Sequence, residues 1–420
     1  MKINRRELLK ISGAATILPF AGCRSTTDEG LLPPQRPRVA TIITEYRRNS
    51  HADVIVGRLL GGYDHDGVRR SPRVQVVSMY TDQVPDNDMS RDLAEKHGYA
   101  IMPSIRDALL MDGDDLAVDG VVLIGEHGDY PLNEKGQKLY PRYELFSQIV
   151  QTFRDTGHAV PVFSDKHLSV EWEKAKWMYD QSVELGFPFL AGSSLPLTWR
   201  RPPIELELDT PVDYAVAAFY GGKESYGFHA LETLQCMVER RQGGETGIEA
   251  VQCLEGPDVW TWTSQTDWAG ELLEAALGRS ETRQAGTPQD NVDEPIAFLL
   301  DYRSGLRAAV YILNGHIRDA VFAASVSRQE EPLSTLFWLQ SGRPFSHFSN
   351  LTFQIEELII NGKANYPVER TLLTTGALAA LMDSSYQGGV RLETTHLDIS
   401  YTAPADSLFS RGPVPPLEEA

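Results

Sequence analysis

The feature that most constrains the fold is an alternation of apolar, β-branched runs with amphipathic segments over the first half of the chain. The runs that we predict to be strands are 39–44 (VATIIT), 74–80 (VQVVSMY), 99–102, 118–124 (VDGVVLI), 160–163 and 187–191. The segments that we predict to be helices are 51–60, 90–97, 104–111, 143–157 and 170–185. Strands that alternate with helices and are apolar on both faces form a doubly wound parallel sheet. We therefore predict an α/β domain over residues 38–197.

The second half of the chain has a different pattern, in which strand-like runs follow one another directly. These runs are 204–208, 212–219, 248–254, 296–302, 307–313, 320–325 and 397–401. The predicted helices of this half are 226–240 and 370–382. Consecutive strands without helices between them pair in an antiparallel sheet. We therefore predict that residues 198–410 form a second α/β domain with a mostly antiparallel sheet, followed by a Pro-rich tail at 411–420.

The N-terminus has the anatomy of an export signal. Basic residues that include Arg5 and Arg6 precede an apolar stretch that is too short to span a membrane. The sequence RRELLK resembles the twin-arginine export motif, and FAGC resembles a lipobox that ends at Cys23. We expect residues 1–22 to be a twin-arginine signal peptide, and residues 23–37 to be a lipidated cysteine and a polar tether. The chain would then be periplasmic and anchored to the membrane by lipid only; a plain cleaved signal is the alternative.

Composition excludes several classes of function. The formal net charge of −19 argues against nucleic acid as a partner, because phosphate backbones attract surfaces rich in Lys and Arg. The chain has 3 cysteines and no CxxC pair, which excludes a disulfide scaffold and disfavours a zinc ribbon. We expect Cys236 and Cys253 to be separately buried free thiols.

Ionisable and aromatic side chains follow two of the predicted strands. The sequence GEHGDY (125–130) follows the strand at 118–124, and Asp165, Lys166 and His167 follow the strand at 160–163. Carboxyl ends of parallel strands meet at one edge of the sheet, which is where such folds bind ligands. A partly buried lysine suits acid–base chemistry there. Imidazoles with carboxylates also suit a divalent metal ion, so metal assistance is an alternative to ordinary polar lining.

Four stretches carry a resemblance to a known family. They are VQVVSMYTD, LAEKHGYAIMPSIRDALLMDGDDLAVDGVVLIGEHGDY, VFSDKHLSVEWEKAKWM and SYGFHALETLQCMV. With the order of elements, they resemble the Gfo/Idh/MocA family of glucose–fructose oxidoreductase and inositol dehydrogenase types. The resemblance implies a Rossmann-like domain, a second domain on a mostly antiparallel sheet, and NAD(P)-dependent oxidation of a sugar or polyol. It also implies a small-molecule carbohydrate as partner, and homo-oligomers formed through the C-terminal sheet.

The resemblance assigns roles to individual residues. Lys166 matches the lysine of the family's Glu-Lys-Pro turn, and His229 matches its active-site histidine. Ser225 stands where the family has an acid, so the neighbouring Glu224 is the third catalytic candidate. The candidates for substrate binding are His127, Asp129, Tyr130, His167 and Trp199.

The dinucleotide loop departs from the family pattern. A GxGxxG loop after the first strand lets the backbone approach a pyrophosphate, but its three positions here carry Thr44, Tyr46 and Asn49. The residues left as cofactor contacts are Thr44, Arg47, Arg48 and Asp82. Three functions therefore stay open: an exported NAD(P)-dependent oxidoreductase, a dinucleotide-independent lyase, isomerase or hydrolase of carbohydrate that could use a metal, and a non-catalytic carbohydrate-binding lipoprotein.

Overall fold

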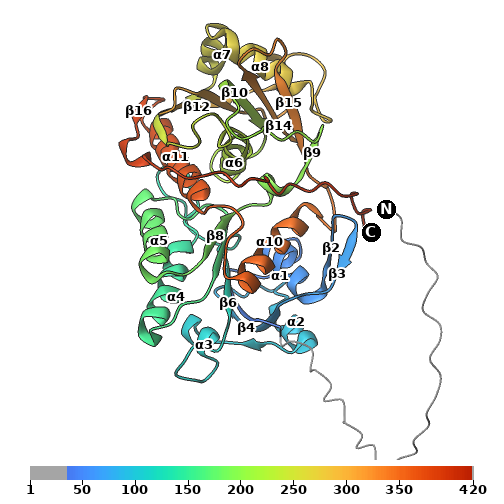
Figure 1. The fold of residues 1–420 in the computed structure, drawn as a ribbon, viewed down its shortest axis with the longest axis vertical. Helices are drawn as coiled ribbons and strands as arrows, with labels where there is room; N and C mark the ends of the chain where they lie inside the picture. The colour runs from blue at the N-terminus through green and yellow to red at the C-terminus, as the bar shows by residue number, and fades with distance from the viewer. Residues whose placement is uncertain (1–35, 419–420) are drawn as a thin grey trace, which may run out of the picture. The chain divides into compact units, whose positions relative to one another are not determined.

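A computed structural model describes residues 36–418, so the predicted signal peptide and Cys23 lie outside the described residues. The first half forms a parallel sheet of six strands in the order β5-β4-β1-β6-β7-β8 (Figure 1). Its strands are β1 (Arg38–Ile43), β4 (Gln75–Thr81), β5 (Ala100–Ile101), β6 (Gly120–Ile124), β7 (Val162–Asp165) and β8 (Phe189–Gly192). Its helices are α1 (His51–Gly61), α2 (Ser90–His97), α3 (Ile105–Leu110), α4 (Arg142–Thr156) and α5 (Trp172–Leu185). The predicted doubly wound sheet is confirmed.

The second half forms a sheet of eight strands in the order β16-β11-β12-β13-β10-β14-β15-β9. Its strands are β9 (Trp199–Arg201), β10 (Val212–Phe219), β11 (Ile248–Glu255), β12 (Ile296–Tyr302), β13 (Arg307–Ile312), β14 (Ala320–Val326), β15 (Leu333–Trp338) and β16 (Leu392–Glu393). Only β10 and β13 pair in parallel, so the sheet is mostly antiparallel, as predicted.

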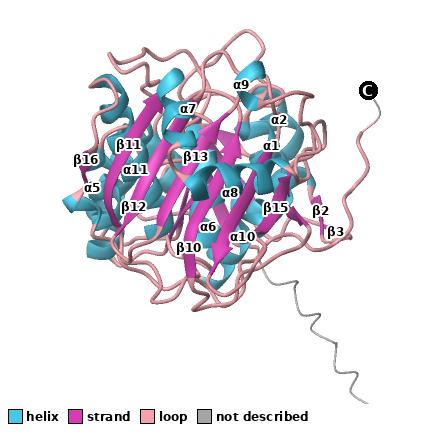
Figure 2. Ribbon diagram, turned by 90° about the horizontal axis from the view of Figure 1, so that it is seen from above, coloured by secondary structure: helices cyan, strands magenta, loops and turns pink. Residues whose placement is uncertain are grey.

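Helices cover both faces of the second sheet (Figure 2). The face toward the parallel sheet packs on α6 (Gly227–Val238) and α11 (Glu369–Tyr386). The other face packs on α7 (Pro257–Ser264) and α8 (Asp267–Leu277), whose apolar residues join the sheet in a separate core. Within residues 36–418, both faces of the sheet that the resemblance implies for homo-oligomers therefore carry helices of this chain.

One helix of the second half packs on the parallel sheet. Helix α10 (His347–Asn361) lies beside α1, and its apolar residues join the core formed by β1 and α1. The short hairpin of β2 (Tyr63–His65) and β3 (Val68–Arg70) contacts the same helix. The remaining elements are α9 (Pro288–Asn291) and the 3-10 turns η1 (Leu195–Leu197) and η2 (Thr395–Leu397). Helix α10 brings residues from late in the chain onto one face of the parallel sheet.

Two predicted strands are wrong. Residues 204–208 form no strand, because the carbonyl oxygens of Ile204 and Leu206 accept hydrogen bonds from the guanidinium groups of Arg200 and Arg240. Residues 397–401 form no strand either: Leu397 ends the 3-10 turn η2, and the rest is irregular apart from one isolated bridge at Tyr401. Cys236 and Cys253 are buried free thiols, as predicted. None of the helices in residues 36–418 combines the length and apolar character that a membrane span requires.

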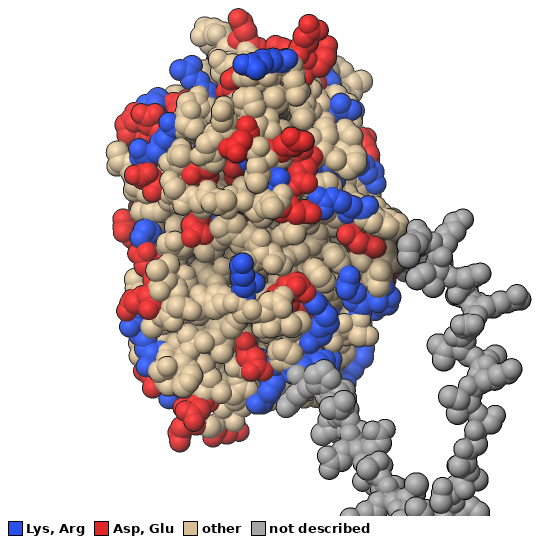
Figure 3. Space-filling model, in the orientation of Figure 1, with Lys and Arg blue, Asp and Glu red and all other residues tan. Residues whose placement is uncertain are grey.

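Acidic and basic side chains are interspersed over the face of the molecule that Figure 3 shows.

Candidate functional site

Buried Lys166 and half-buried His229 form a pair between the two sheets. Lys166 directly follows β7 in a left-handed conformation, with φ of 67°, and its side chain is 3% exposed. Its ammonium group lies 2.7 Å from Nε2 of His229 and donates to the carbonyl oxygen of Ser225 at 3.0 Å. The carboxylate of Glu126 lies 3.7 Å away. The structure therefore brings together two residues that are 63 positions apart in the sequence.

A chain of hydrogen bonds continues from His229 into the protein interior. Nδ1 of His229 lies 3.0 Å from Oγ of Ser193, and that hydroxyl bonds the carboxylate of Glu232. Gly192 makes room for this carboxylate, because a Cβ at this position would lie 2.5 Å from Oε1 of Glu232. Because Lys166 donates to Nε2, the proton of a neutral His229 sits on Nδ1 and points to Ser193.

Burial determines which side chains of this hydrogen-bond chain carry a proton. Burial, with the charge of Lys166, lowers the pKa of His229 well below its usual value, so the imidazole is neutral at neutral pH. The partial positive charge at the start of α6 acts in the same direction. Burial raises the pKa of Glu232 from 4.5 to about 7, although hydrogen bonds from Ser193 oppose that shift. Near neutral pH, Glu232 can therefore hold or release a proton at the inner end of the chain.

A second buried polar cluster lies beside Lys166. Arg142 donates to Glu126 at 2.5 Å and lies 3.0 Å from Nε2 of His167. Glu224 lies 2.8 Å from the same imidazole nitrogen. Burial alone would raise the pKa of Glu126, but Lys166 and Arg142 outweigh it and hold the pKa well below its usual range. Glu224 therefore lies with His167 and not against the Lys166–His229 pair.

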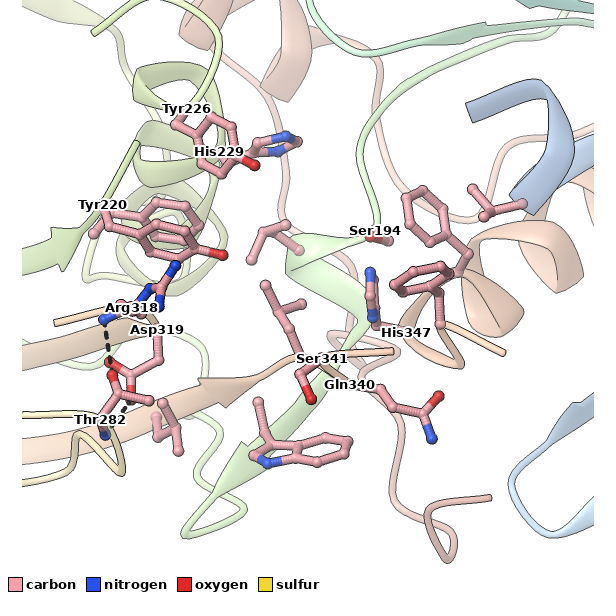
Figure 4. Close-up of a pocket in the computed structure, with 18 of the residues that line it drawn as sticks. Ser194, Tyr220, Tyr226, His229, Thr282, Arg318, Asp319, Gln340, Ser341 and His347 are labelled. Carbon is pink, nitrogen blue, oxygen red and sulfur yellow. Dashed lines mark hydrogen bonds between the residues drawn. The ribbon is translucent and has the colours of Figure 1, made fainter. Parts of the chain in front are cut away.

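A cavity of about 510 Å³ lies in front of His229 (Figure 4). It is bounded by the ends of β10 and β15, the start of α6 and the segment 339–348 that leads into α10. Four imidazoles line it: those of His51, His127, His229 and His347. Tyr220, Tyr226 and Arg318 line the side near β10, and the side chain of His347 stands across the cavity from them.

Two of these histidines are held neutral by their surroundings. Burial and the nearby His51 lower the pKa of His127 to about 4. Burial, with the charge of Arg58, lowers the pKa of His347 to about 3. The fourth imidazole, His51, is the first residue of α1, and its Nδ1 lies 2.6 Å from the fully buried carboxylate of Asp165. A neutral imidazole with a free nitrogen can accept a proton or a hydrogen bond from a ligand.

Side chains bridge the crevice where a doubly wound sheet usually takes a dinucleotide. This crevice lies at the switch point between β1 and β6. The hydroxyl of Thr44 donates to the carbonyl of Glu126 at 2.8 Å, and Arg47 lies 3.3 Å from Nδ1 of His127. Further along, Tyr130 donates to Asp82 at 2.6 Å. Gln83 and Asp129 also exchange two hydrogen bonds, at 2.8 and 2.9 Å. Arg47 and Asp82, which were predicted to bind a cofactor, thus hydrogen-bond His127 and Tyr130, which were predicted to bind substrate.

The start of α1 is also filled by the protein's own groups. The carboxylate of Asp53 accepts from the backbone of Asn49 at 2.8 Å and from Arg343 at 2.7 Å. Ser50 caps the helix by accepting from the backbone of Asp53. A carboxylate at a helix N-terminus occupies the place of a phosphate and repels one. The ring of Tyr46 is fully buried in the core under α1. These residues do not fit a dinucleotide bound in the usual way.

The remaining predicted site residues do not line the cavity. Trp199 is buried on β9, and its indole N–H donates to the carbonyl of Gly412 at 2.7 Å. Arg48 lies on an exposed turn, and the side chain of Asp129 is exposed. Within residues 36–418, no group of three or more His, Cys, Asp or Glu side chains is arranged to hold a metal ion. The metal-assisted alternative therefore has no ligand set in the described part of the chain.

Sequence reasoning missed several residues that shape the site. His51 was hidden at the start of a predicted helix, and His347 belongs to a helix that was not predicted. Ser193 and Glu232 carry no motif, although Glu232 follows His229 by three residues and so lies about one turn along the same face of α6. That spacing is a signal that could have been read from the sequence.

Neither a family model nor a curated protein matches this chain by sequence. Solved structures do match it. GenD2 from gentamicin A biosynthesis, solved in complex with NAD, is 13% identical, with 87% of this chain and 100% of that chain covered and a TM-score of 0.54. Myo-inositol 2-dehydrogenase from Lactobacillus plantarum is 12% identical, with 86% and 99% covered and a TM-score of 0.51.

A third structure is myo-inositol dehydrogenase from Lactobacillus casei in complex with NAD(H) and myo-inositol. It is 10% identical, with 86% of this chain and 97% of that chain covered and a TM-score of 0.52. Likeness at these identities concerns the fold, and function has to be argued from the site. The predicted resemblance is confirmed at that level: this chain has the fold of the Gfo/Idh/MocA-type dehydrogenases, a Rossmann-like domain followed by a mostly antiparallel sheet.

Proposed function

We propose that this chain acts on a carbohydrate or polyol in the cavity in front of His229, by proton transfer through the Lys166–His229 pair. The observation that carries the proposal is the 2.7 Å contact between Nζ of Lys166 and Nε2 of His229 beside a cavity of about 510 Å³. A cavity of this volume accommodates a sugar-sized ligand. The fold likeness to inositol dehydrogenases supports the class of substrate.

The walls of the cavity suit a polyhydroxylated ligand. The rings of Phe219 and Tyr220 are stacked, 5.1 Å apart at 8°, and both line the cavity. A flat aromatic face packs against the C–H groups of a sugar ring while the tyrosine hydroxyl keeps a polar partner. Neutral imidazoles at His127 and His347 add hydrogen-bonding groups that carry no charge.

The pair supplies a proton path. Lys166 holds the ammonium proton against Nε2 of His229, and Ser193 connects Nδ1 to Glu232. A ligand hydroxyl that inserts between Lys166 and His229 could accept a hydrogen bond from the ammonium group of Lys166 and donate one to Nε2 of His229. The proton removed from the ligand can pass along His229 and Ser193 to Glu232, whose pKa of about 7 allows it to accept.

We further propose that this chemistry proceeds without a dinucleotide in the β1–β6 crevice. The bridges from Thr44, Arg47 and Asp82 to the loop after β6, and the carboxylate of Asp53 at the start of α1, support this. Isomerisation of a sugar requires proton transfers alone. Elimination also breaks a C–O bond, whose electron pair leaves with an oxygen that an acid such as Lys166 protonates, and neither reaction needs a hydride acceptor. The second candidate is an NAD(P)-dependent oxidoreductase, which the NAD complex of the similar GenD2 structure favours. That function would require the bridges to open.

Ligand binding tests the proposal. Myo-inositol and D-glucose at about 10 mM serve as probes, and a ligand present at 100 times its Kd stabilises the folded chain by about 2.7 kcal/mol. We expect at least one probe to raise the melting temperature of the wild-type chain. Replacement of His229 by Gln or Tyr220 by Ala should abolish this rise, whereas the control His158→Gln, on an exposed loop, should retain it. Equal rises in all variants would contradict the proposed site.

We also propose that the chain is exported by the twin-arginine route and anchored through lipidated Cys23. Arg5, Arg6 and the FAGC sequence support this proposal. The mass of the mature protein tests it, because a lipidated chain that begins at Cys23 carries acyl groups. A mature mass without acyl groups would leave the export proposal standing and overturn the anchor.

A further inference from the structure

The cavity holds a second ionisable unit that the Lys166–His229 pair does not use. It consists of His51, the first residue of α1, and Asp165, the last residue of β7. Nδ1 of the imidazole lies 2.6 Å from Oδ2 of the carboxylate, although the two residues are 114 positions apart. Asp165 is fully buried, and the side chain of His51 is 15% exposed at the cavity wall. The fold therefore places a carboxylate behind an imidazole that faces the cavity.

We propose that His51 is a general base of this site, oriented by Asp165; the proposal rests on the proposed function of the same cavity. The carboxylate accepts the proton on Nδ1, which fixes the tautomer and leaves the lone pair on Nε2. Among residues 36–418, no group hydrogen-bonds Nε2 of His51, whereas both ring nitrogens of His229 have protein partners. Of these two imidazoles, His51 is therefore the one that is ready to take a proton from a ligand.

The step is a proton transfer from a ligand hydroxyl. The lone pair of Nε2 takes the proton, the electrons of the broken O–H bond stay on the ligand oxygen, and the imidazolium that forms is stabilised by Asp165. His51 lies at the start of α1 and His229 at the start of α6, and both line the same cavity. With acid–base groups on two helices, the site can remove a proton at one position of a ligand and return one at another.

The neighbours of His51 suit this role. The ring of His127 contacts His51 edge to face at 5.2 Å, and Phe348 does so at 5.3 Å. The other carboxylate oxygen of Asp165 is buried and has no hydrogen-bond partner within the described residues. Within the described residues, His51 is thus the hydrogen-bond partner of the Asp165 carboxylate, and contacts with the rings of His127 and Phe348 restrict rotation of the imidazole. The other charged groups near this unit are Arg47, Glu126 and Lys166.

Diethyl pyrocarbonate tests the proposal without a known substrate, because it acylates neutral imidazoles that have a free nitrogen. Labelling at pH 7 is followed for each histidine by peptide mass spectrometry. We expect His51 to react faster than His229, and faster than exposed His158. Asp165→Asn offers the imidazole an amide that can reverse the tautomer, and it should slow labelling of His51 by about tenfold or more without changing His229. Unchanged labelling in Asp165→Asn would overturn the proposal.

A second measurement keeps the test decisive if Asp165→Asn does not fold. Two-dimensional ¹H–¹⁵N spectra of wild-type protein, with Asp165→Glu as the conservative variant, report which nitrogen of His51 carries the proton. A proton on Nδ1 in both supports the proposal, and a proton on Nε2 overturns it. Neither experiment contains a sugar, so failure of myo-inositol and D-glucose to bind would count against the proposed function and leave the His51 result intact.

Discussion

Glu232 gives the sharpest test of the buried hydrogen-bond chain, because its protonation couples to folding. Its side chain is 1% exposed, and burial raises its pKa from 4.5 to about 7. The folded protein therefore holds this proton more tightly than the unfolded chain does, by about 3 kcal/mol. That stabilisation is fully present below pH 4.5 and is lost as the pH rises through 7. Glu232 thus makes the folded state less stable at pH 8 than at pH 5.

Glu232→Gln removes the titration and keeps the shape of the side chain. The free energy of unfolding of wild type, relative to the variant, should fall by about 2 to 3 kcal/mol between pH 5 and pH 8. Urea unfolding followed by tryptophan fluorescence at the two pH values measures this double difference. Because other carboxylates titrate in both proteins, their contributions cancel in the comparison.

Glu95→Gln, on the exposed face of α2, is the matched control and should show no pH-dependent difference from wild type. A difference between wild type and Glu232→Gln that is equal at pH 5 and pH 8 would refute the reasoning. It would mean that Glu232 titrates in the folded state near its ordinary pKa, and the proposed proton acceptor behind His229 would then be ionised throughout.

Three further predictions concern the same region. Glu126→Gln should destabilise the fold by about 3 kcal/mol in urea, because it leaves two buried cations without their carboxylate; a loss under 1 kcal/mol would contradict this. Wild type should lose about 2 kcal/mol more than His347→Gln between pH 7 and pH 5, because a histidine with a folded pKa of about 3 takes up its proton only on unfolding; equal losses would contradict this. Gly192→Ala should lower the melting temperature more than Gly136→Ala. Both glycines have positive φ, but only at residue 192 would the new Cβ lie 2.5 Å from Oε1 of Glu232. Equal shifts in melting temperature would contradict this.

Local patterns of the sequence predicted all six strands of the parallel sheet and β10 to β14 of the second sheet, but not β9, β15 or β16. The runs VATIIT and VDGVVLI became β1 and β6, because strands buried on both faces must be apolar throughout. The unpredicted helix α10 contains Ser, Asn, Thr and Gln on buried positions, so its periodicity is weak in the sequence. Its place beside α1 depends on packing between residues almost 300 positions apart, which no local pattern records.

The candidate site was predictable only where local sequence resembled the family. Lys166 directly follows β7 and His229 lies in the first turn of α6, and both were assigned through the motifs that they match. The 2.6 Å contact between His51 and Asp165 depends on how α1 sits over the sheet edge, and the partner of Glu224 depends on the tertiary position of His167. Sequence spacing does not contain such distances. It did show that the dinucleotide loop lacks glycines, although not that Asp53 fills the start of α1.

The most direct test of the account is native mass spectrometry of the folded chain, before and after denaturation, with and without added NAD⁺ or NADP⁺. We predict that the folded chain has the same mass before and after denaturation, so that no dinucleotide is released. We also predict that about 0.2 mM NAD⁺ or NADP⁺ gives no adduct, since the bridged crevice and Asp53 leave no place for a pyrophosphate. A released mass that matches NAD(H) or NADP(H), or a stoichiometric adduct, would contradict the account and establish hydride transfer as the chemistry to pursue.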